Sequence, residues 1–237
     1  AGKPLQKSKR AGDYKLESLF HDSPTGSYQD WIGCHATSKS GTKLIRVYLE
    51  HQQATEADRQ TVRRASEREY QVLNRLDHPG ILRAETLTPT DLGHALVFRL
   101  DDSCVRLDQF LAEQGDTFSL GERIELLRLI AQAVAYAHRR KVVHRALSPQ
   151  SILIKTDSKT GSPKPLLYNF QVSLARSESH ATGQTRVSRT LHADQLLEDI
   201  STVYLAPELV SGQEMEGDEL DSFSLGAISY HLFSGQP

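Results

Sequence analysis

The sequence predicts an α+β fold with two lobes: a small antiparallel sheet with one long helix, then a mainly α-helical lobe. Strands are indicated in the first part by the alternating segment KLIRVYL at 43–49 and the apolar segment ALVFRL at 95–100. The spacing of apolar residues predicts a long helix over about 55–76 and a second over about 120–139. Strand signals therefore gather before residue 100, and helix signals after it.

The composition is that of a globular protein with a sizeable core. Of 237 residues, 38% are hydrophobic and 24% charged, and the net charge of -2 gives no overall attraction to nucleic acid or membrane. No apolar run approaches the roughly 18 residues that a membrane-spanning helix needs. Cys34 and Cys104 lack the spacing of a metal site or a disulfide framework, so we expect a reduced, cytoplasmic protein.

The first lobe is expected to span residues 13–98, after a basic linker at 1–12. In the strand at 43–49, the alternation places Leu44, Arg46 and Tyr48 on one face. In the helix at 55–76, Glu69 falls within the apolar stripe, where a buried carboxylate needs a partner. The sequence SKSGT before the strand predicts a hairpin turn.

The second lobe is expected to span residues 99–237. Strands are predicted near 151–154 and 164–168, and an apolar helix over 221–233. Residues 173–202 are polar, rich in Ser and Thr and without clear periodicity, as functional or mobile loops often are. The predicted apolar face of the helix at 120–139 consists of Leu120, Ile124, Leu127, Ala131, Val134 and His138.

Five motifs in this order resemble a protein kinase domain of the eukaryotic-like serine/threonine class. They are EREYQVLNRLDHPGIL at 67–82, VVHRALSPQSILI at 142–154, LLYNFQVSLA at 166–175, YLAPEL at 204–209 and DSFSLG at 221–226. The resemblance runs from the first strand to the end of the chain. It implies the two-lobed kinase fold, with the second lobe incomplete after the Asp221 helix.

The resemblance also implies that the positions carrying kinase chemistry are replaced. Ala146 stands at the catalytic aspartate, which accepts the proton of the substrate hydroxyl, and Ser148 at the lysine of the same loop. The two magnesium ligands of the family are replaced by Ser151 and Asn169. An engineered Asp→Ala change would explain Ala146 alone, but not the other replacements. We expect no metal site.

The nucleotide-binding positions are altered as well. Arg46 stands at the strand lysine that pairs with the helix glutamate, here Glu69. Of the three glycines in the phosphate-covering loop only Gly26 remains. Trp31 aligns with a small valine beside the adenine, although ordinary sheet packing is an equal interpretation. The other positions that the resemblance assigns to the nucleotide are Leu44 and Leu153.

The positions that build the kinase scaffold are kept. The resemblance implies that His144 and Phe170 belong to an internal apolar column with Leu73, and that Asp221 anchors the backbone of the catalytic loop. Glu208 would pair with an arginine beyond the end of this chain. The full set of matched scaffold residues is His144, Arg145, Phe170, Ala206, Pro207, Glu208 and Asp221.

Retained scaffold and lost chemistry predict a pseudokinase, a regulatory or scaffolding module that binds other proteins or other domains of its own chain. The alternatives are an unconventional active ATP-dependent serine/threonine kinase, with its site rebuilt from carboxylates such as Asp157, Asp194, Glu198 and Asp199, and a nucleotide-binding switch without phosphoryl transfer. We expect no cofactor; ATP is the ligand that both alternatives require, and the replaced ligands argue against magnesium.

Three further expectations concern partners. The sequences GSYQDWIGCH, IRVYLE and HRALSPQS are similar to the kinase-like part of large bacterial phage-defence proteins, in which it follows a nuclease-related domain. The basic run HRRK at 138–141 suits a helix C-terminus, so nucleic-acid binding is not indicated. Hydroxyls between Ser177 and Tyr204 are candidate phosphorylation sites that would dock on Arg145, with a plain flexible loop as the alternative.

Overall fold

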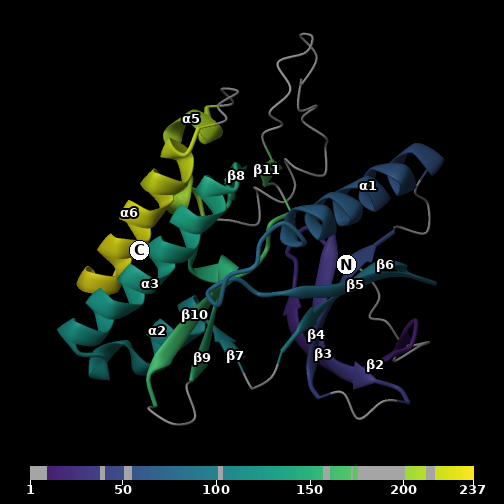
Figure 1. The fold of residues 1–237 in the computed structure, drawn as a ribbon, viewed down its shortest axis with the longest axis horizontal. Coiled ribbons are helices and arrows are strands. Elements are labelled where there is room, and N and C mark those ends of the chain that lie inside the picture. Colours follow the sequence, from purple (N-terminus) through teal and green to yellow (C-terminus); the bar gives the residue numbers. More distant parts are fainter. Residues whose placement is uncertain are drawn as a thin grey trace. The chain divides into compact units, whose positions relative to one another are not determined.

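The structure is a computed structural model that describes residues 10–37, 41–50, 55–100, 104–156, 161–171, 173–175, 201–211 and 217–237 (Figure 1). The described residues form two compact units. Unit 1 comprises residues 10–74 and 83–100, and unit 2 comprises residues 75–82 and those from 104 onward. Most of the predicted basic linker and of the Ser/Thr-rich segment lies outside the described residues, as do the candidate phosphorylation sites at 177–200.

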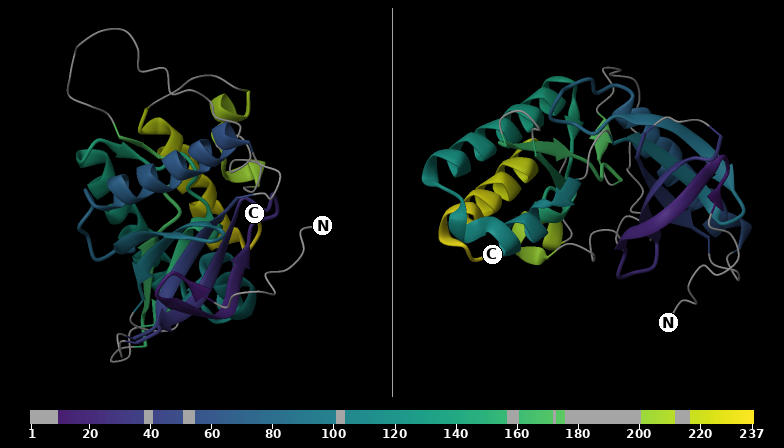
Figure 2. Two further views of the ribbon diagram at one scale, coloured as in Figure 1. Left: turned by 90° about the vertical axis from the view of Figure 1, so that its right-hand side faces the viewer. Right: turned by 90° about the horizontal axis from the view of Figure 1, so that it is seen from below.

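Unit 1 is a curled antiparallel sheet with one long helix (Figure 2). The strand order is β1-β2-β3-β4-β6-β5. The strands are β1 (Arg10–Ala11), β2 (Tyr14–Asp22), β3 (Tyr28–His35), β4 (Lys43–Leu49), β5 (Ala84–Thr90) and β6 (Gly93–Arg99). The two strands predicted at 43–49 and 95–100 are β4 and β6, which pair with each other.

Strand β4 is buried on both faces because each face has its own cover. On one face Ile45 and Val47 join an apolar cluster with Ala11, Leu16, Ala95 and Val97. On the other face lie Leu44, Arg46 and Tyr48, as the alternation predicts, and helix α1 contacts this strand. Two covered faces explain why a strand with a buried arginine is otherwise almost continuously apolar.

Helix α1 (Glu56–Leu73) is the helix predicted over 55–76. It begins at a capping box, in which the Thr55 hydroxyl accepts from the Asp58 amide and the Asp58 carboxylate accepts from the Thr55 amide. The buried side chains of α1 are Ala65, Ser66, Glu69, Val72 and Leu73. Glu69 is thus buried within the helix face that the sequence indicated.

The described part of unit 2 is mainly helical, with two small sheets and three 3₁₀ turns. Its helices are α2 (Leu107–Gln114), α3 (Leu120–Arg139), α5 (Pro207–Val210) and α6 (Glu219–Ser234), with 3₁₀ turns η1 (Gly115–Thr117), η2 (Pro149–Ser151) and η3 (Thr202–Tyr204). One sheet has the order β10-β9-β7, from β7 (Cys104–Arg106), β9 (Ile152–Thr156) and β10 (Pro163–Leu167), and β8 (Val142–Val143) pairs with β11 (Leu174–Ala175). Helices α3 and α6 lie side by side.

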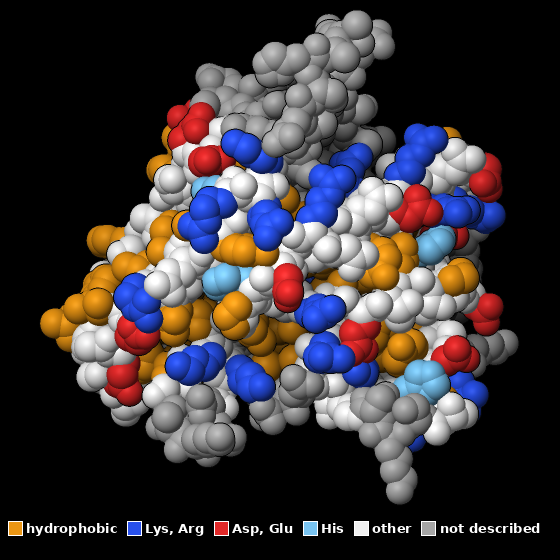
Figure 3. All heavy atoms as spheres, in the orientation of Figure 1, with side chains coloured by type: hydrophobic (Ala, Val, Ile, Leu, Met, Phe, Trp, Pro, Cys, Tyr) orange, Lys and Arg blue, Asp and Glu red, His pale blue; other side chains and the backbone are white. Residues whose placement is uncertain are grey.

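The bounds of α3 are as predicted, but of its predicted apolar face only Val134 is buried. In Figure 3, hydrophobic side chains gather on the surface over α3 and α6. Of the predicted residues, Leu120 and Ile124 are 65% and 53% exposed. The buried residues are Leu126, Ile130, Ala133, Val134 and Ala137. Because this helix is apolar on more than one side, spacing alone did not identify the face that packs.

Within the described residues, no helix combines the length and the apolar character that a bilayer crossing requires. The curled antiparallel sheet of unit 1 and the helices that follow it in the chain confirm the predicted α+β fold class.

Candidate functional site

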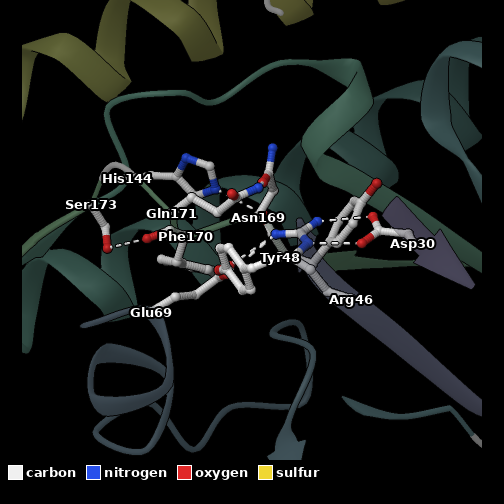
Figure 4. A network of polar contacts seen from close by, with 10 residues as sticks. Asp30, Arg46, Tyr48, Glu69, His144, Asn169, Phe170, Gln171 and Ser173 are labelled. Atoms are coloured by element: carbon white, nitrogen blue, oxygen red, sulfur yellow. Dashed lines mark hydrogen bonds and ion pairs between the residues drawn. The ribbon is translucent and has the colours of Figure 1, made fainter. Parts of the chain in front are cut away.

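The guanidinium of Arg46 is the centre of a buried polar network in unit 1 (Figure 4). Asp30 on β3 is the cross-strand partner of Arg46 on β4, so both side chains point to the same face of the sheet. Nε and Nη2 of Arg46 donate to the two carboxylate oxygens of Asp30 over 2.8 and 2.9 Å. Both side chains are fully buried. This is the paired, planar geometry in which arginine binds a carboxylate most strongly.

Helix α1 supplies a second carboxylate to the same guanidinium. Nη1 of Arg46 donates to Oε1 and Oε2 of Glu69 over 3.1 and 3.3 Å, and the hydroxyl of Tyr48 also donates to Oε2. The ring of Tyr28 lies 4.4 Å from Cζ of Arg46, in a cation–π contact. The Arg46–Glu69 ion pair expected from the sequence is confirmed.

Burial and charge act against each other in this network. Burial alone would lower the pKa of Arg46, but Asp30 and Glu69 outweigh it and hold the pKa well above its usual value. Burial raises the pKa of Glu69; Arg46 and the Tyr48 hydroxyl offset this only in part, and the charge of Asp30 raises it further. Burial, together with the charge of Glu69, raises the pKa of Tyr48. The network therefore contains one more carboxylate than its single cation balances.

Sequence reasoning missed Asp30. Its signal was present, because an aspartate inside the strand-like segment SYQDWIG is unusual and calls for a buried partner. The partner could be identified only from the register of β3 against β4. That register pairs Asp30 with Arg46, 16 residues later in the chain.

Gly26 lies in the turn between β2 and β3, the position of the phosphate-covering loop in the resemblance. Its φ of 69° is in the left-handed region that favours glycine, and a Cβ there would meet nothing within 4 Å. The hydroxyls of Ser23, Thr25 and Ser27 lie 2.9 to 3.1 Å from one another. The glycine is thus explained by the turn itself, and the turn is closed by its own hydroxyl groups.

Of the two interpretations of Trp31, the structure supports sheet packing. Trp31 pairs with Ile45 and packs against the apolar cluster on the face of the sheet opposite to Leu44 and Arg46. The residue that pairs with Leu44 is Ile32. The alignment that placed Trp31 beside an adenine is therefore corrected: Trp31 and Leu44 lie on different faces of the sheet. Leu44 itself is fully buried.

In unit 2, Asp221 of α6 holds the backbone of the catalytic-loop motif. Its Oδ2 accepts from the amide of His144 over 2.8 Å, and its Oδ1 accepts from the amide of Arg145 over 2.7 Å. A third contact joins Oδ2 to Nε2 of His138 over 2.8 Å. Arg145 has a φ of 67°, which few residues other than glycine adopt, so this anchor stabilises a strained turn. The predicted role of Asp221 is confirmed.

His144 is buried and packs against Phe170, with ring centroids 4.5 Å apart. Its Nε2 donates to the carbonyl of Tyr168 over 2.9 Å, and its Nδ1 accepts from the amide of Ala146 over 3.3 Å. Burial lowers the pKa of His144. The His144–Phe170 part of the predicted column is confirmed, and the contribution of Leu73, which belongs to unit 1, stays a prediction.

In the loop that matches the catalytic-loop motif, the hydroxyl of Ser151 is bound within the loop itself. Ala146 is buried and has no group that could accept a proton. The hydroxyl of Ser151 accepts from the amide of Ser148 over 2.9 Å and donates to the Ser148 carbonyl over 2.9 Å. This hydroxyl closes the turn η2, in the way that Ser side chains often satisfy nearby backbone groups.

Asn169 and Gln171 stand where the resemblance places a metal-binding aspartate and a glycine. The side-chain amide of Gln171 donates to Oδ1 of Asn169. Asn169 has a φ of 67°, which asparagine and aspartate tolerate better than most residues. Asn169 and Ser151 together offer neutral oxygens that already accept hydrogen bonds, a poor fit to the hard, doubly charged magnesium ion. Within the described residues, no three His, Cys, Asp or Glu side chains form a metal-binding group.

Of the remaining predicted residues, Leu153 and Ala206 are buried, whereas Pro207 is exposed. Leu153 is fully buried on β9, and Ala206 packs with Leu209 and Leu220. Pro207 opens α5, where its fixed φ suits the first turn. Glu208 is half-buried in the same helix, and its expected arginine partner stays a prediction.

The order of elements and the Asp221 anchor define the class of protein. A sequence model of the protein kinase domain matches residues 34–237, and the chain belongs to this family.

The chain is similar to longer kinases from two organisms. It is 30% identical over 244 aligned residues to probable kinase PglW of Streptomyces coelicolor, which covers 96% of the chain and 15% of that protein. It is 29% identical to myosin light chain kinase A of Dictyostelium discoideum, over 71% of the chain and 51% of the relative. A third relative, probable serine/threonine-protein kinase fhkD of the same organism, is 29% identical over 74% of the chain and 23% of its own length. The chain thus spans about half or less of each of these relatives.

Proposed function

We propose that this kinase domain is a pseudokinase, which serves as a regulatory or scaffolding module and does not transfer phosphate. Its partners are other proteins or other domains of the same chain, and its location is the cytoplasm. The observation that carries the proposal is the Asp30–Arg46–Glu69 network, in which the cation at the nucleotide-binding position is fully buried between two carboxylates of its own unit.

The catalytic loop in unit 2 supports the proposal independently. Ala146 removes the proton acceptor, and the oxygens of Ser151 and Asn169 accept hydrogen bonds from their own loop segments. Phosphoryl transfer depends on positioning and on electrostatic stabilisation of developing charge, so losing the base and the metal ligands together removes many kcal/mol of stabilisation. The backbone that would carry these groups is nevertheless well anchored by Asp221.

The alternative is an unconventional but active ATP-dependent serine/threonine kinase, or a nucleotide-binding switch that transfers no phosphate. The names of the relatives favour an active kinase, since PglW is called a probable kinase. The carboxylates from which such a site was expected to be rebuilt, Asp157, Asp194, Glu198 and Asp199, lie outside the described residues. Nothing in the described loop replaces the lost proton acceptor.

The wider setting proposed for the domain is a large bacterial phage-defence protein. The resemblance of its sequence to the kinase-like part of such proteins supports this setting. A bacterial relative that matches 96% of the chain, and of which the chain spans only 15%, is in keeping with one domain of a long polypeptide.

The test is a melting experiment with and without ATP, each at zero and millimolar magnesium, followed by a phosphoryl-transfer assay. A ligand at a hundred times its Kd would add about 2.7 kcal/mol of stability, so binding would raise Tm by several degrees. We expect no shift and no transfer. Autophosphorylation that is lost in Asn169→Ala but kept in the exposed control Asn74→Ala would contradict the proposal.

A further inference from the structure

The ion pair between Arg46 and Glu69 in unit 1 is complete without Asp30, so Asp30 has a further role. Arg46 and Glu69 already balance each other in charge, and Tyr48 donates a further hydrogen bond to Glu69. Asp30 adds a second carboxylate to a fully buried cluster that contains one guanidinium. Burying an unbalanced charge is costly, so its presence calls for an explanation beyond charge balance.

The geometry of Asp30 indicates what it does. Its carboxylate occupies the edge of the guanidinium formed by Nε and Nη2, where two parallel N–H groups point in the same direction (Figure 4). Arginine binds both carboxylates and phosphates in a bidentate manner through such an edge, because its two N–H donors match the spacing of two oxygen atoms. Asp30 therefore stands where an oxygen pair of an external oxyanion would bind.

The electrostatics of the cluster act in the same direction. Burial raises the pKa of Glu69, and the neighbouring carboxylate of Asp30 acts in the same direction, because like charges at short range oppose each other. An additional anion would meet two carboxylates for one cation, with no water to screen them. The ring of Tyr28 stacks 4.4 Å from Cζ of Arg46 and covers a face of the guanidinium. Charge and space thus both oppose a second anion at Arg46.

We propose that Asp30 is a built-in anion that closes the oxyanion position at Arg46 and so determines that unit 1 does not bind phosphate-type ligands. The inference rests on the proposed function and names the residue responsible for one part of it. The ligand class excluded is a polyphosphate, free or as part of a nucleotide.

The test is to replace Asp30 and to titrate the whole chain with inorganic tripolyphosphate. Calorimetry at constant ionic strength measures the Kd. Asp30→Ala removes both the charge and the carboxylate, while Asp30→Asn removes the charge and keeps the volume. We expect at least tenfold tighter tripolyphosphate binding in Asp30→Ala than in the unchanged chain. The gain should vanish in Asp30→Ala/Arg46→Gln. The matched control is Asp22→Ala, which removes an exposed carboxylate of the same unit and should bind like the unchanged chain.

Two results would overturn the inference. One is a folded Asp30→Ala or Asp30→Asn chain that binds tripolyphosphate no more tightly than the unchanged chain. The other is saturable binding to the unchanged chain that Arg46→Gln abolishes, which decides the question even if neither Asp30 variant folds. Phosphoryl transfer by the unchanged chain would instead contradict the pseudokinase proposal, so the two failures are distinguishable.

Discussion

At the scale of single residues, the buried guanidinium of Arg46 governs the electrostatics of unit 1. A charge without exposure to water is tolerated only when hydrogen bonds and opposite charges surround it. Asp30, Glu69 and the ring of Tyr28 provide these surroundings from β3 and α1. The residue thus joins the sheet to its helix through charge, and Tyr48 on the same face joins them through a hydrogen bond to Glu69.

Replacing Arg46 should therefore be far more costly than replacing an exposed arginine of the same unit. Arg46→Met leaves two buried carboxylates without a cation, and we expect a loss of about 3–5 kcal/mol in the free energy of unfolding. Arg63→Met breaks only the exposed pair with Glu67 and should cost less than about 0.5 kcal/mol. Fluorescence of Trp31, the single tryptophan, reports unit 1 in a urea titration. Equal losses in the two variants would contradict this account.

The buried histidine of unit 2 predicts a dependence of stability on pH. Burial holds the pKa of His144 below its usual value of about 6.5. Below that pH the unfolded chain takes up a proton that the folded chain refuses, so the free energy of unfolding should fall as the pH drops from about 7.5 to 5.5. The slope from this residue is at most about 1.4 kcal/mol per pH unit. Urea unfolding at several pH values measures it, and an unchanged slope in His144→Asn would contradict the assignment.

At the scale of elements, α6 acts on the catalytic-loop motif through Asp221. This single carboxylate accepts hydrogen bonds from two successive backbone amides and contacts the ring of His138. It thereby holds Arg145 in a left-handed conformation that is costly without support. The backbone of the loop is thus anchored independently of which side chain stands at position 146.

Asp221→Asn should weaken this anchor strongly. An asparagine would direct an N–H₂ group at one of the two backbone amides, so we expect a loss of about 2–4 kcal/mol in the free energy of unfolding of unit 2. Asp218→Asn, one turn earlier and exposed, makes no capping hydrogen bond with its side chain and should change stability by less than about 0.5 kcal/mol. Far-UV circular dichroism in urea compares the two. Similar midpoints for both variants would contradict the anchor.

At the scale of the whole molecule, the chain combines two units that each bury their own polar network. In unit 1 the network includes the hydrogen bond from Arg46 to Asp30. In unit 2 the hydrogen bonds lie within the Ser148–Ser151 turn and between Gln171 and Asn169. The guanidinium of Arg46 and the side-chain oxygens of Ser151 and Asn169 are thus hydrogen-bonded within their own units. This common feature is what the pseudokinase proposal explains.

Restoring the metal ligands should restore binding of magnesium to the chain. Ser151→Asn/Asn169→Asp returns one carboxylate and one amide oxygen, and aspartate tolerates the backbone conformation at position 169. We expect millimolar magnesium to stabilise this variant by about 1 kcal/mol, a rise in Tm of roughly 2–4 °C. The unchanged chain should show no such rise. Asn74→Asp, which adds a negative charge at the exposed end of α1, serves as the control, and an equal rise there would indicate a general charge effect.

The fold and part of the site could be read from the sequence because their signals are local. The alternation at 43–49 gave the burial of Arg46, the stripe of the long helix gave the burial of Glu69, and motif order gave the Asp221 anchor. The predicted packed face of α3 was wrong except at Val134, and the two interpretations of Trp31 could not be separated from the sequence. Both depend on which neighbour covers an apolar side chain, and periodicity contains no information about that neighbour.

By itself, the sequence determined the fold class, the family and the residues that stand at the kinase motif positions, because each of these is a matter of residue type at a fixed order along the chain. Only the tertiary structure decided what the remaining groups do. Asp30 and Arg46 are 16 residues apart, and the register of β3 against β4 alone makes them partners. Strand register is fixed by the sum of contacts across the sheet, so the closure of Arg46 is a property of the assembled unit.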